Sequence, residues 1–116
     1  MITIVDHIAF RVKDIDKISN LLQQVGYAEL SRTEHHGGAV LLESPKQPGL
    51  VLEFTVLREG EVPGFDHVCF KLDGEKELNE LMSSGFPIYG EPSLSSAGRY
   101  IANFKDPDGN KWQLTL

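Results

Sequence analysis

Two histidines and two side chains with oxygen donors recur along this chain at the same interval. His7 and His67 are 60 residues apart, and so are Glu53 and Gln113. A repeat of this kind implies two copies of one supersecondary unit, related by an approximate twofold axis on which repeated residues can converge. Imidazole nitrogens combined with carboxylate and amide oxygens suit a first-row transition metal ion. The spacing therefore predicts a metal site made by these four residues.

Such a site would support proton transfer next to a carbonyl group. A divalent ion with open positions can bind two neighbouring substrate oxygens and stabilise the charge that develops there when the proton leaves. Glu53 is the carboxylate of the set and the expected catalytic base. Gln113 cannot take a proton, but its carbonyl oxygen can bind a metal. One base suits movement of the same proton between neighbouring carbons, whereas an epimerase usually needs a second base on the opposite face.

The repeat extends beyond these four residues. Residues 6–10 return as residues 66–70, and residues 49–55 return as residues 109–115. Each half predicts the order strand, helix, strand, strand, strand. The chain therefore reads as two β-α-β-β-β modules.

These modules define the expected fold class. We expect an α+β fold in which both modules form one curled mixed sheet within a single domain, residues 1–116. The modules are about residues 1–57 and 64–116. Polar residues 58–63, which include Pro63, form the linker between them.

The elements of the first half follow from local signals. Asp14 is a good N-cap for a helix, and Gly26 is a good stop. Between them the residues at helical spacing are apolar: Ile15, Ile18, Leu21, Leu22 and Val25. Strands are expected over residues 3–13, 27–33, 39–43 and 50–57.

The second half follows the same order. A helix is expected over residues 74–84, with Gly85 as its stop and Leu78, Leu81 and Met82 on its apolar stripe. Residues 106–109 have the composition of a turn. Strands are expected over residues 65–72, 99–105 and 111–116, and a short strand or edge segment is expected over residues 87–91.

Alternation along the strands separates a polar face from an apolar one. Because neighbouring residues on a strand point to opposite faces, the four candidate ligands lie on the polar face of their strands. Cys69 shares the face of His67 and, having Ala9 as its counterpart, is expected to be a small buried filler. The apolar face is expected to pack against the helices and carries Ile8, Phe10, Val12, Leu52, Phe54, Val68, Phe70, Leu72, Trp112 and Leu114.

Composition excludes several classes of function. The chain has 116 residues, 41% of them hydrophobic, and a formal charge of −6, which disfavours binding to nucleic acid. It has no apolar run long enough for a membrane span and no basic-then-apolar leader, so no membrane partner is expected. Cys69 is the one cysteine, which fits a reducing compartment. We therefore expect a cytoplasmic protein.

Three segments resemble the vicinal oxygen chelate superfamily: residues 6–14, 64–68 and 101–114. This superfamily includes glyoxalase I, methylmalonyl-CoA epimerase, extradiol dioxygenases and the fosfomycin- and bleomycin-resistance proteins. The chain looks most like glyoxalase I, and the resemblance covers its whole length. It implies the glyoxalase/bleomycin-resistance/dioxygenase fold.

The resemblance also implies a ligand set. In families like glyoxalase I the metal is held at the positions that here are His7, Glu53, His67 and Gln113. The fourth position is usually Glu, so the chain resembles the extradiol dioxygenases and fosfomycin-resistance enzymes less, because they need a carboxylate there. One divalent ion per site is implied, with Ni, Co or Zn first and Mn or Fe as further possibilities.

Two arginines are candidates for substrate binding. Arg11 matches an arginine that grips a glutathione carboxylate in glyoxalase I, although Leu57 stands where that family has an Asn contacting glutathione. Arg99 lies at the start of an expected strand at the edge of the cavity, where it could hold a carboxylate or phosphate or simply cap the surface. His35 and His36 precede a glycine turn and are expected to be exposed loop residues.

The resemblance leaves four possibilities open for the function. The leading one is a metal-dependent lyase or isomerase of the glyoxalase I type, similar to lactoylglutathione lyase, that moves a proton through an enediolate stabilised by the metal. The alternatives are an isomerase like methylmalonyl-CoA epimerase, a non-catalytic small-molecule binding protein like the bleomycin-resistance members, and a family relative with a degraded or unknown activity. The intact residues His7, Glu53 and His67 argue against the binding protein. We expect a small-molecule substrate and a homodimer.

Overall fold

The structure is a computed structural model of the chain and describes residues 2–34, 37–95 and 98–116. It contains two compact units. The N-terminal unit comprises His7–Asp66, and the C-terminal unit comprises Met1–Asp6 together with His67–Leu116. The expectation for His35 and His36 lies outside the described residues.

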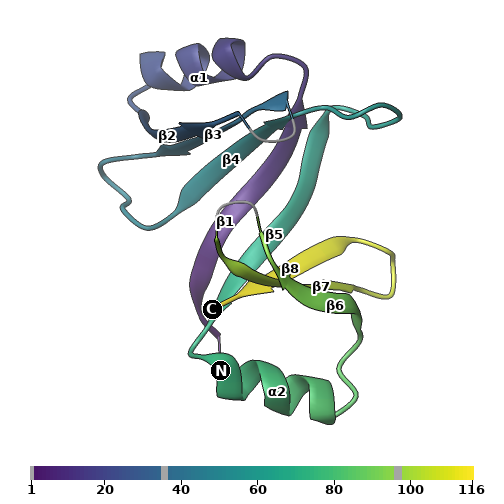
Figure 1. Cartoon of the computed structure of the whole chain (residues 1–116). Helices are drawn as coiled ribbons and strands as arrows, with labels where there is room; N and C mark the ends of the chain where they lie inside the picture. The colour runs from purple at the N-terminus through teal and green to yellow at the C-terminus, as the bar shows by residue number, and fades with distance from the viewer. Residues whose placement is uncertain (1, 35–36, 96–97) are drawn as a thin grey trace. The chain divides into compact units, whose positions relative to one another are not determined.

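The N-terminal unit contains a helix and a four-stranded mixed sheet (Figure 1). Its strand order is β2-β3-β4-β1, with β1 parallel to β4 and the other neighbours antiparallel. The parallel pair is possible because α1 and two further strands connect β1 to β4. The elements are β1 (Ile2–Val12), α1 (Ile15–Gln24), β2 (Ala28–Thr33), β3 (Ala39–Glu43) and β4 (Val51–Val56).

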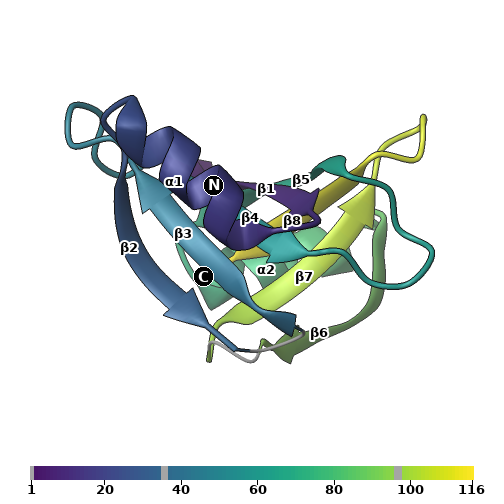
Figure 2. The same cartoon turned by 90° about the horizontal axis from the view of Figure 1, so that it is seen from above.

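Helix α1 begins and ends where the sequence predicts. The Asp14 side chain caps it by accepting hydrogen bonds from the backbone N–H groups of Asp16 and Lys17, at 3.0 and 3.1 Å. Gly26 follows the helix at φ = 103°, a conformation that glycine adopts without steric cost. Helix α1 lies over β3 in Figure 2. Its apolar side covers the core residues Val40, Leu42 and Phe54.

Not every apolar residue at helical spacing in and after α1 reaches this core. Ile15, Ile18 and Leu22 pack against it, whereas Leu21 is 58% exposed and Val25 is 75% exposed. These two side chains lie outside the narrow arc that the helix presents to the sheet. Leu21 is adjacent to Leu22 in the sequence and therefore points about 100° away from it around the helix axis. Val25 is the C-cap residue, where the helix ends.

The C-terminal unit repeats this arrangement. Its strand order is β5-β8-β7-β6, with β5 parallel to β8 and the other neighbours antiparallel. Its core consists of Leu72, Leu78, Ala102 and Leu114. Leu81 of the expected helix stripe packs against this core, whereas Met82 is exposed, which corrects the expectation for that residue. The elements are β5 (Gly64–Leu72), α2 (Glu75–Ser83), β6 (Ile88–Leu94), β7 (Tyr100–Lys105) and β8 (Lys111–Thr115).

The turn between β7 and β8 is built around one carboxylate. Asp106 accepts hydrogen bonds from the backbone N–H groups of Asp108 and Asn110, from the Asn110 side chain and from Trp112 Nε1, at 2.8 to 3.1 Å. These bonds favour the charged form, with the Asn110 side chain as the largest cause, and lower the pKa of Asp106 to about 2. Trp112 stacks between Phe70 and Phe104. The carboxylate thus fixes both the turn and the indole.

The α+β class and the two β-α-β-β-β modules are confirmed. The units divide between residues 6 and 7 and between residues 66 and 67, so that β1 and β5 each contribute to both. Description of the chain as one domain with a linker at residues 58–63 stays a prediction. Neither helix of the described chain has the length and apolar character needed to cross a membrane.

Candidate functional site

The N-terminal unit holds one candidate ligand on each of two neighbouring parallel strands. His7 lies on β1 and Glu53 on β4, where Glu53 pairs with Ala9. His7 and Ala9 share a face of β1, so Glu53 is a diagonal neighbour of His7. Nε2 of His7 is 3.7 Å from Oε2 of Glu53. The register therefore brings together two residues that are 46 positions apart in the sequence.

The His7–Glu53 geometry fits two ligands of one metal ion. Bonds of about 2.0–2.2 Å to nitrogen and oxygen place neighbouring ligand atoms roughly 3–3.5 Å apart. The observed separation is a few tenths of an ångström larger, and it is longer than a normal hydrogen bond. His7 is 7% exposed, and the Glu53 side chain is 28% exposed. A buried imidazole beside a half-buried carboxylate leaves one side of the pair open.

Thr55 lies two residues beyond Glu53 on the same face of β4. Its Oγ1 is 3.5 Å from Oε1 of Glu53, at the limit of a weak hydrogen bond. The contact involves the oxygen that does not face His7. The two carboxylate oxygens thus have different surroundings, with the hydroxyl near one and the imidazole near the other.

The C-terminal unit holds the second pair in the equivalent register. His67 lies on β5 and is 6% exposed, and Gln113 lies on β8, half-buried, paired with Cys69. This pairing reproduces that of Ala9 with Glu53. Each unit therefore offers one imidazole and one side-chain oxygen in matching positions. The binding of one ion by all four residues stays a prediction.

Cys69 has the environment expected of a small filler. It is fully buried, and its Sγ is 3.9 Å from the Phe70 carbonyl oxygen, a weak contact. Its counterpart in the repeat, Ala9, is buried as well. The matching burial supports a packing role for Cys69.

Both arginines that the sequence suggested for substrate binding face carboxylates of the chain itself. Arg11 Nε lies 3.5 Å from Glu61 and 3.7 Å from Asp66. It is buried and makes no hydrogen bond within the described chain. Arg99 donates two hydrogen bonds to Asp6, at 2.6 and 2.8 Å. Substrate binding by either arginine stays a prediction.

The two aspartates are features that the sequence analysis did not assign. Asp6 and Asp66 immediately precede His7 and His67, and they obey the same repeat. This recurrence is the sequence signal for the two aspartates, because a charged residue beside each candidate ligand indicates an oppositely charged partner nearby. The partners themselves are distant in sequence and carry no matching signal.

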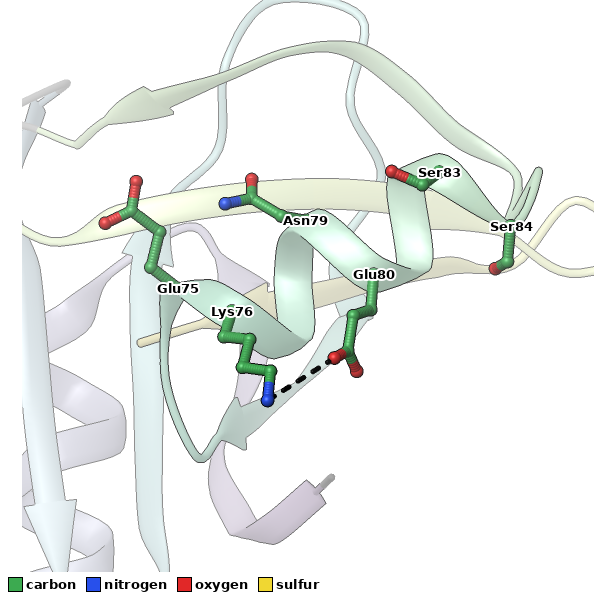
Figure 3. A pocket seen from close by; sticks show the side chains of 6 residues that line it. All are labelled: Glu75, Lys76, Asn79, Glu80, Ser83 and Ser84. Carbon is green, nitrogen blue, oxygen red and sulfur yellow. Dashed lines mark ion pairs between the residues drawn. The ribbon is translucent and has the colours of Figure 1, made fainter.

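A surface hollow lies elsewhere in the C-terminal unit. It has a volume of about 660 Å³ and lies along helix α2, where Lys76 Nζ is 3.9 Å from Glu80 (Figure 3). Both of these side chains are more than half exposed. The hollow contains none of the predicted ligands or arginines, so it is not part of the candidate metal site.

Comparison with known proteins places this geometry in context. A model of the family described as Glyoxalase/Bleomycin resistance protein/Dioxygenase superfamily matches residues 4–114. A structure of a selenomethionine methylmalonyl-CoA epimerase is 22% identical, with a TM-score of 0.78 over 99% of this chain and 95% of that chain.

Two further structures have the same fold. Methylmalonyl-CoA epimerase from Mycobacterium tuberculosis is 19% identical, with a TM-score of 0.78 over 98% of this chain and 87% of that one. A variant of the Streptomyces coelicolor epimerase, in complex with 2-nitronate-propionyl-CoA, is 18% identical, with a TM-score of 0.78 over 99% and 97%. At these identities the likeness establishes the shared fold.

Proposed function

Because the chain belongs to the glyoxalase/bleomycin resistance protein/dioxygenase superfamily, we propose that it is a metal-dependent isomerase that moves a proton on a carbon next to a carbonyl group. The observation that carries the proposal is the His7–Glu53 pair, 3.7 Å apart and partly shielded from solvent. It combines a metal ligand with a carboxylate that can act as a base. The chemistry requires both.

His7, Glu53, His67 and Gln113 are the residues that would hold the metal. The superfamily typically binds a divalent metal, and imidazole with side-chain oxygens suits Ni, Co, Zn, Mn or Fe. The support is the 60-residue repeat, the matching register in the two units and the separation of His7 from Glu53. When bound, the ion supplies a positive charge that stabilises negative charge on a substrate oxygen.

Glu53 takes the proton from one face of the carbon next to the carbonyl group, and the configuration inverts when a second group or water delivers a proton to the opposite face. Oε2 of Glu53 is the oxygen near His7, and Thr55 lies beside Oε1. Gln113 replaces a second carboxylate with a neutral amide. The four side chains therefore carry a single negative charge when both histidines are neutral. Fewer anionic ligands leave more of the metal's charge available to the substrate oxygen.

An acyl thioester of coenzyme A is the substrate class to test first. The support is the fold shared with methylmalonyl-CoA epimerases, one of them in complex with a CoA thioester analogue. A thioester carbonyl acidifies the neighbouring carbon, which is the proton transfer for which the proposed site is suited. The lyase reading suggested by the sequence has less support from these neighbours.

The first test is deuterium exchange at the α-carbon of methylmalonyl-CoA in D2O, followed by proton NMR. Protein loaded with Co²⁺ or Ni²⁺ is expected to exchange the α-proton of methylmalonyl-CoA for deuterium and to interconvert the two epimers. The control is Glu53→Gln, loaded with the same metal, which keeps an oxygen ligand but loses the base. Exchange by both proteins would contradict the role of Glu53. Exchange by neither would contradict this substrate.

One observation favours a second candidate, the glyoxalase type of reaction. The proposed ligand set contains one carboxylate, and a single base suits transfer of a proton between neighbouring carbons of a hemithioacetal. Methylglyoxal with several thiols, assayed by ultraviolet absorbance, tests this directly. Turnover here without exchange on the CoA ester would favour it. Tight binding of ligands without turnover in either assay would favour a binding protein.

Two further properties are part of the proposal. We expect a homodimer in the cytoplasm, as the composition and the superfamily suggest. Sedimentation velocity of the untagged protein tests the first of these. A monomer at all concentrations, still active in the exchange assay, would contradict it.

A further inference from the structure

We propose that Arg99 is a positioning residue that acts through Asp6 to hold the metal ligand His7. The inference rests on the proposed function, because it concerns the residues assigned to the metal. Arg99 immediately precedes β7, and Asp6 lies on β1, 93 positions away. Both belong to the C-terminal unit. Asp6 is the residue directly before His7.

The contact between Arg99 and Asp6 is directional. Nη1 of Arg99 donates to one carboxylate oxygen at 2.6 Å, and Nη2 donates to the other at 2.8 Å. Two parallel charge-assisted bonds fix the orientation of a carboxylate as well as its position. The Asp6 side chain is 16% exposed, so solvent competes little for its oxygens. Asp6 is therefore held more firmly than a single ion pair would hold it.

Asp6 also lies close to β5, the strand that carries the candidate ligand His67. One of its carboxylate oxygens is within 4.8 Å of Cys69 Sγ, and Cys69 pairs with the metal-ligand candidate Gln113. The Asp6 carboxylate thus belongs to the residue next to His7 in the sequence, and it lies close in space to Cys69, which pairs with Gln113. A shift of Asp6 would move the backbone that carries His7.

The repeat supplies a looser counterpart of this arrangement. Asp66 precedes His67 as Asp6 precedes His7, and Arg11 Nε lies 3.7 Å from Asp66. In each case the arginine comes from the other half of the sequence. The distance between Arg11 Nε and Asp66 is longer than a hydrogen bond. Arg11 Nε also lies 3.5 Å from a second carboxylate, that of Glu61. Arg99 therefore carries the stronger constraint and is the residue to test.

The experiment titrates untagged protein with Co²⁺ and records the visible absorption bands, which report the geometry of the ligands around cobalt. Arg99→Lys keeps the charge but loses the two-pronged hydrogen bonding. Its Kd for Co²⁺ is expected to rise about 10- to 100-fold, with altered bands, as for losses of other groups that orient metal ligands. Asp6→Asn is expected to do the same and serves if Arg99→Lys folds poorly.

Arg32→Lys is the matched control. Like Arg99, the Arg32 side chain is 38% exposed, and it is ion-paired with Asp16 at 2.6 Å and with Glu29. It lies on β2, a strand without predicted ligands. Its cobalt affinity and bands are expected to match those of the wild type. A general loss of ion pairing would instead weaken binding in both variants and would overturn the inference.

A double variant tests whether Arg99 acts through Asp6. Arg99→Lys with Asp6→Asn should bind Co²⁺ no more weakly than the worse single variant, because both remove the same contact. Additive losses would overturn the inference. An unchanged cobalt spectrum with a raised KM would overturn it in favour of direct substrate binding by Arg99. Failure of the wild type to bind Co²⁺ would overturn the proposed function itself, and with it this role.

Discussion

Nε2 of His7 lies 3.7 Å from Oε2 of Glu53, across the parallel strands β1 and β4. The imidazole nitrogen has one lone pair, so it can bind a metal ion or accept a proton but not both. The carboxylate has two oxygens, so one can bind the metal while the other accepts a proton. Because the two residues belong to one unit and to paired strands, their separation is set by the register of a single ladder. Because of this arrangement, a substitution at Glu53 can remove the base while keeping an oxygen ligand in the same place.

Glu53→Gln is expected to lower turnover by at least about 100-fold, because the amide cannot accept the proton. The metal content should fall much less, since the amide oxygen remains a ligand. Turnover by the exchange assay and metal by elemental analysis give the two numbers. The control is Glu43→Gln, which changes another half-buried carboxylate of the same unit and should leave turnover intact.

His67→Ala is expected to remove most of the bound metal, because it deletes one of the two proposed imidazole ligands. Wild-type protein purified without a His tag should hold about one ion per site after loading. Elemental analysis of both proteins, with circular dichroism to show that the variant is folded, measures the effect. Equal metal in the two proteins would remove His67 from the ligand set.

Gln113→Glu is expected to bind the metal more tightly, by about tenfold, because it adds a negative charge to the proposed ligand set. Titration with Co²⁺ under competition by a chelator measures the change. An affinity equal to that of the wild type would indicate that residue 113 does not contact the ion.

The matching strand positions of the candidate ligands could be predicted because these residues obey the repeat, and their strands could be predicted because each alternates polar and apolar residues. The partners of Arg11 and Arg99 could not. Arg99 meets Asp6 across 93 positions, and nothing in the local sequence of either residue signals the other. Such a contact depends on how the strands are ordered in the sheet, which periodicity alone does not reveal.

Strand β6 shows a similar limit for the fold. The sequence predicts a short strand or edge segment over residues 87–91, and Pro92, which lacks the N–H group that a strand ladder needs, follows it. The strand continues to Leu94 because it lies at the edge of the sheet, with a register irregularity between Tyr89 and Ser93. An edge position with a bulge tolerates proline. The position of a strand within the sheet therefore decides what its composition permits.

Helix α1 offers a test of the same point with two neighbouring leucines. Leu22 packs against the core of the N-terminal unit, whereas Leu21 is mostly exposed. Leu22→Ala should lower the free energy of unfolding by about 2 kcal/mol or more, and Leu21→Ala by about 0.5 kcal/mol or less. Urea denaturation measures both. Similar losses would mean that Leu21 is also covered in solution, for example by a partner chain.

The Asp106 turn predicts a dependence of stability on acid. The pKa of Asp106 in the folded protein is about 2, below the ordinary value of 3.8, mainly because of the hydrogen bond from the Asn110 side chain. Between these values the unfolded chain binds more protons, so this group's stabilisation is complete above about pH 4. It is lost as the pH falls through about 2. Asp106→Asn should therefore lower the Tm at pH 7 and make little difference near pH 2. A constant difference in Tm across this range would show that the charge of Asp106 does not stabilise the turn.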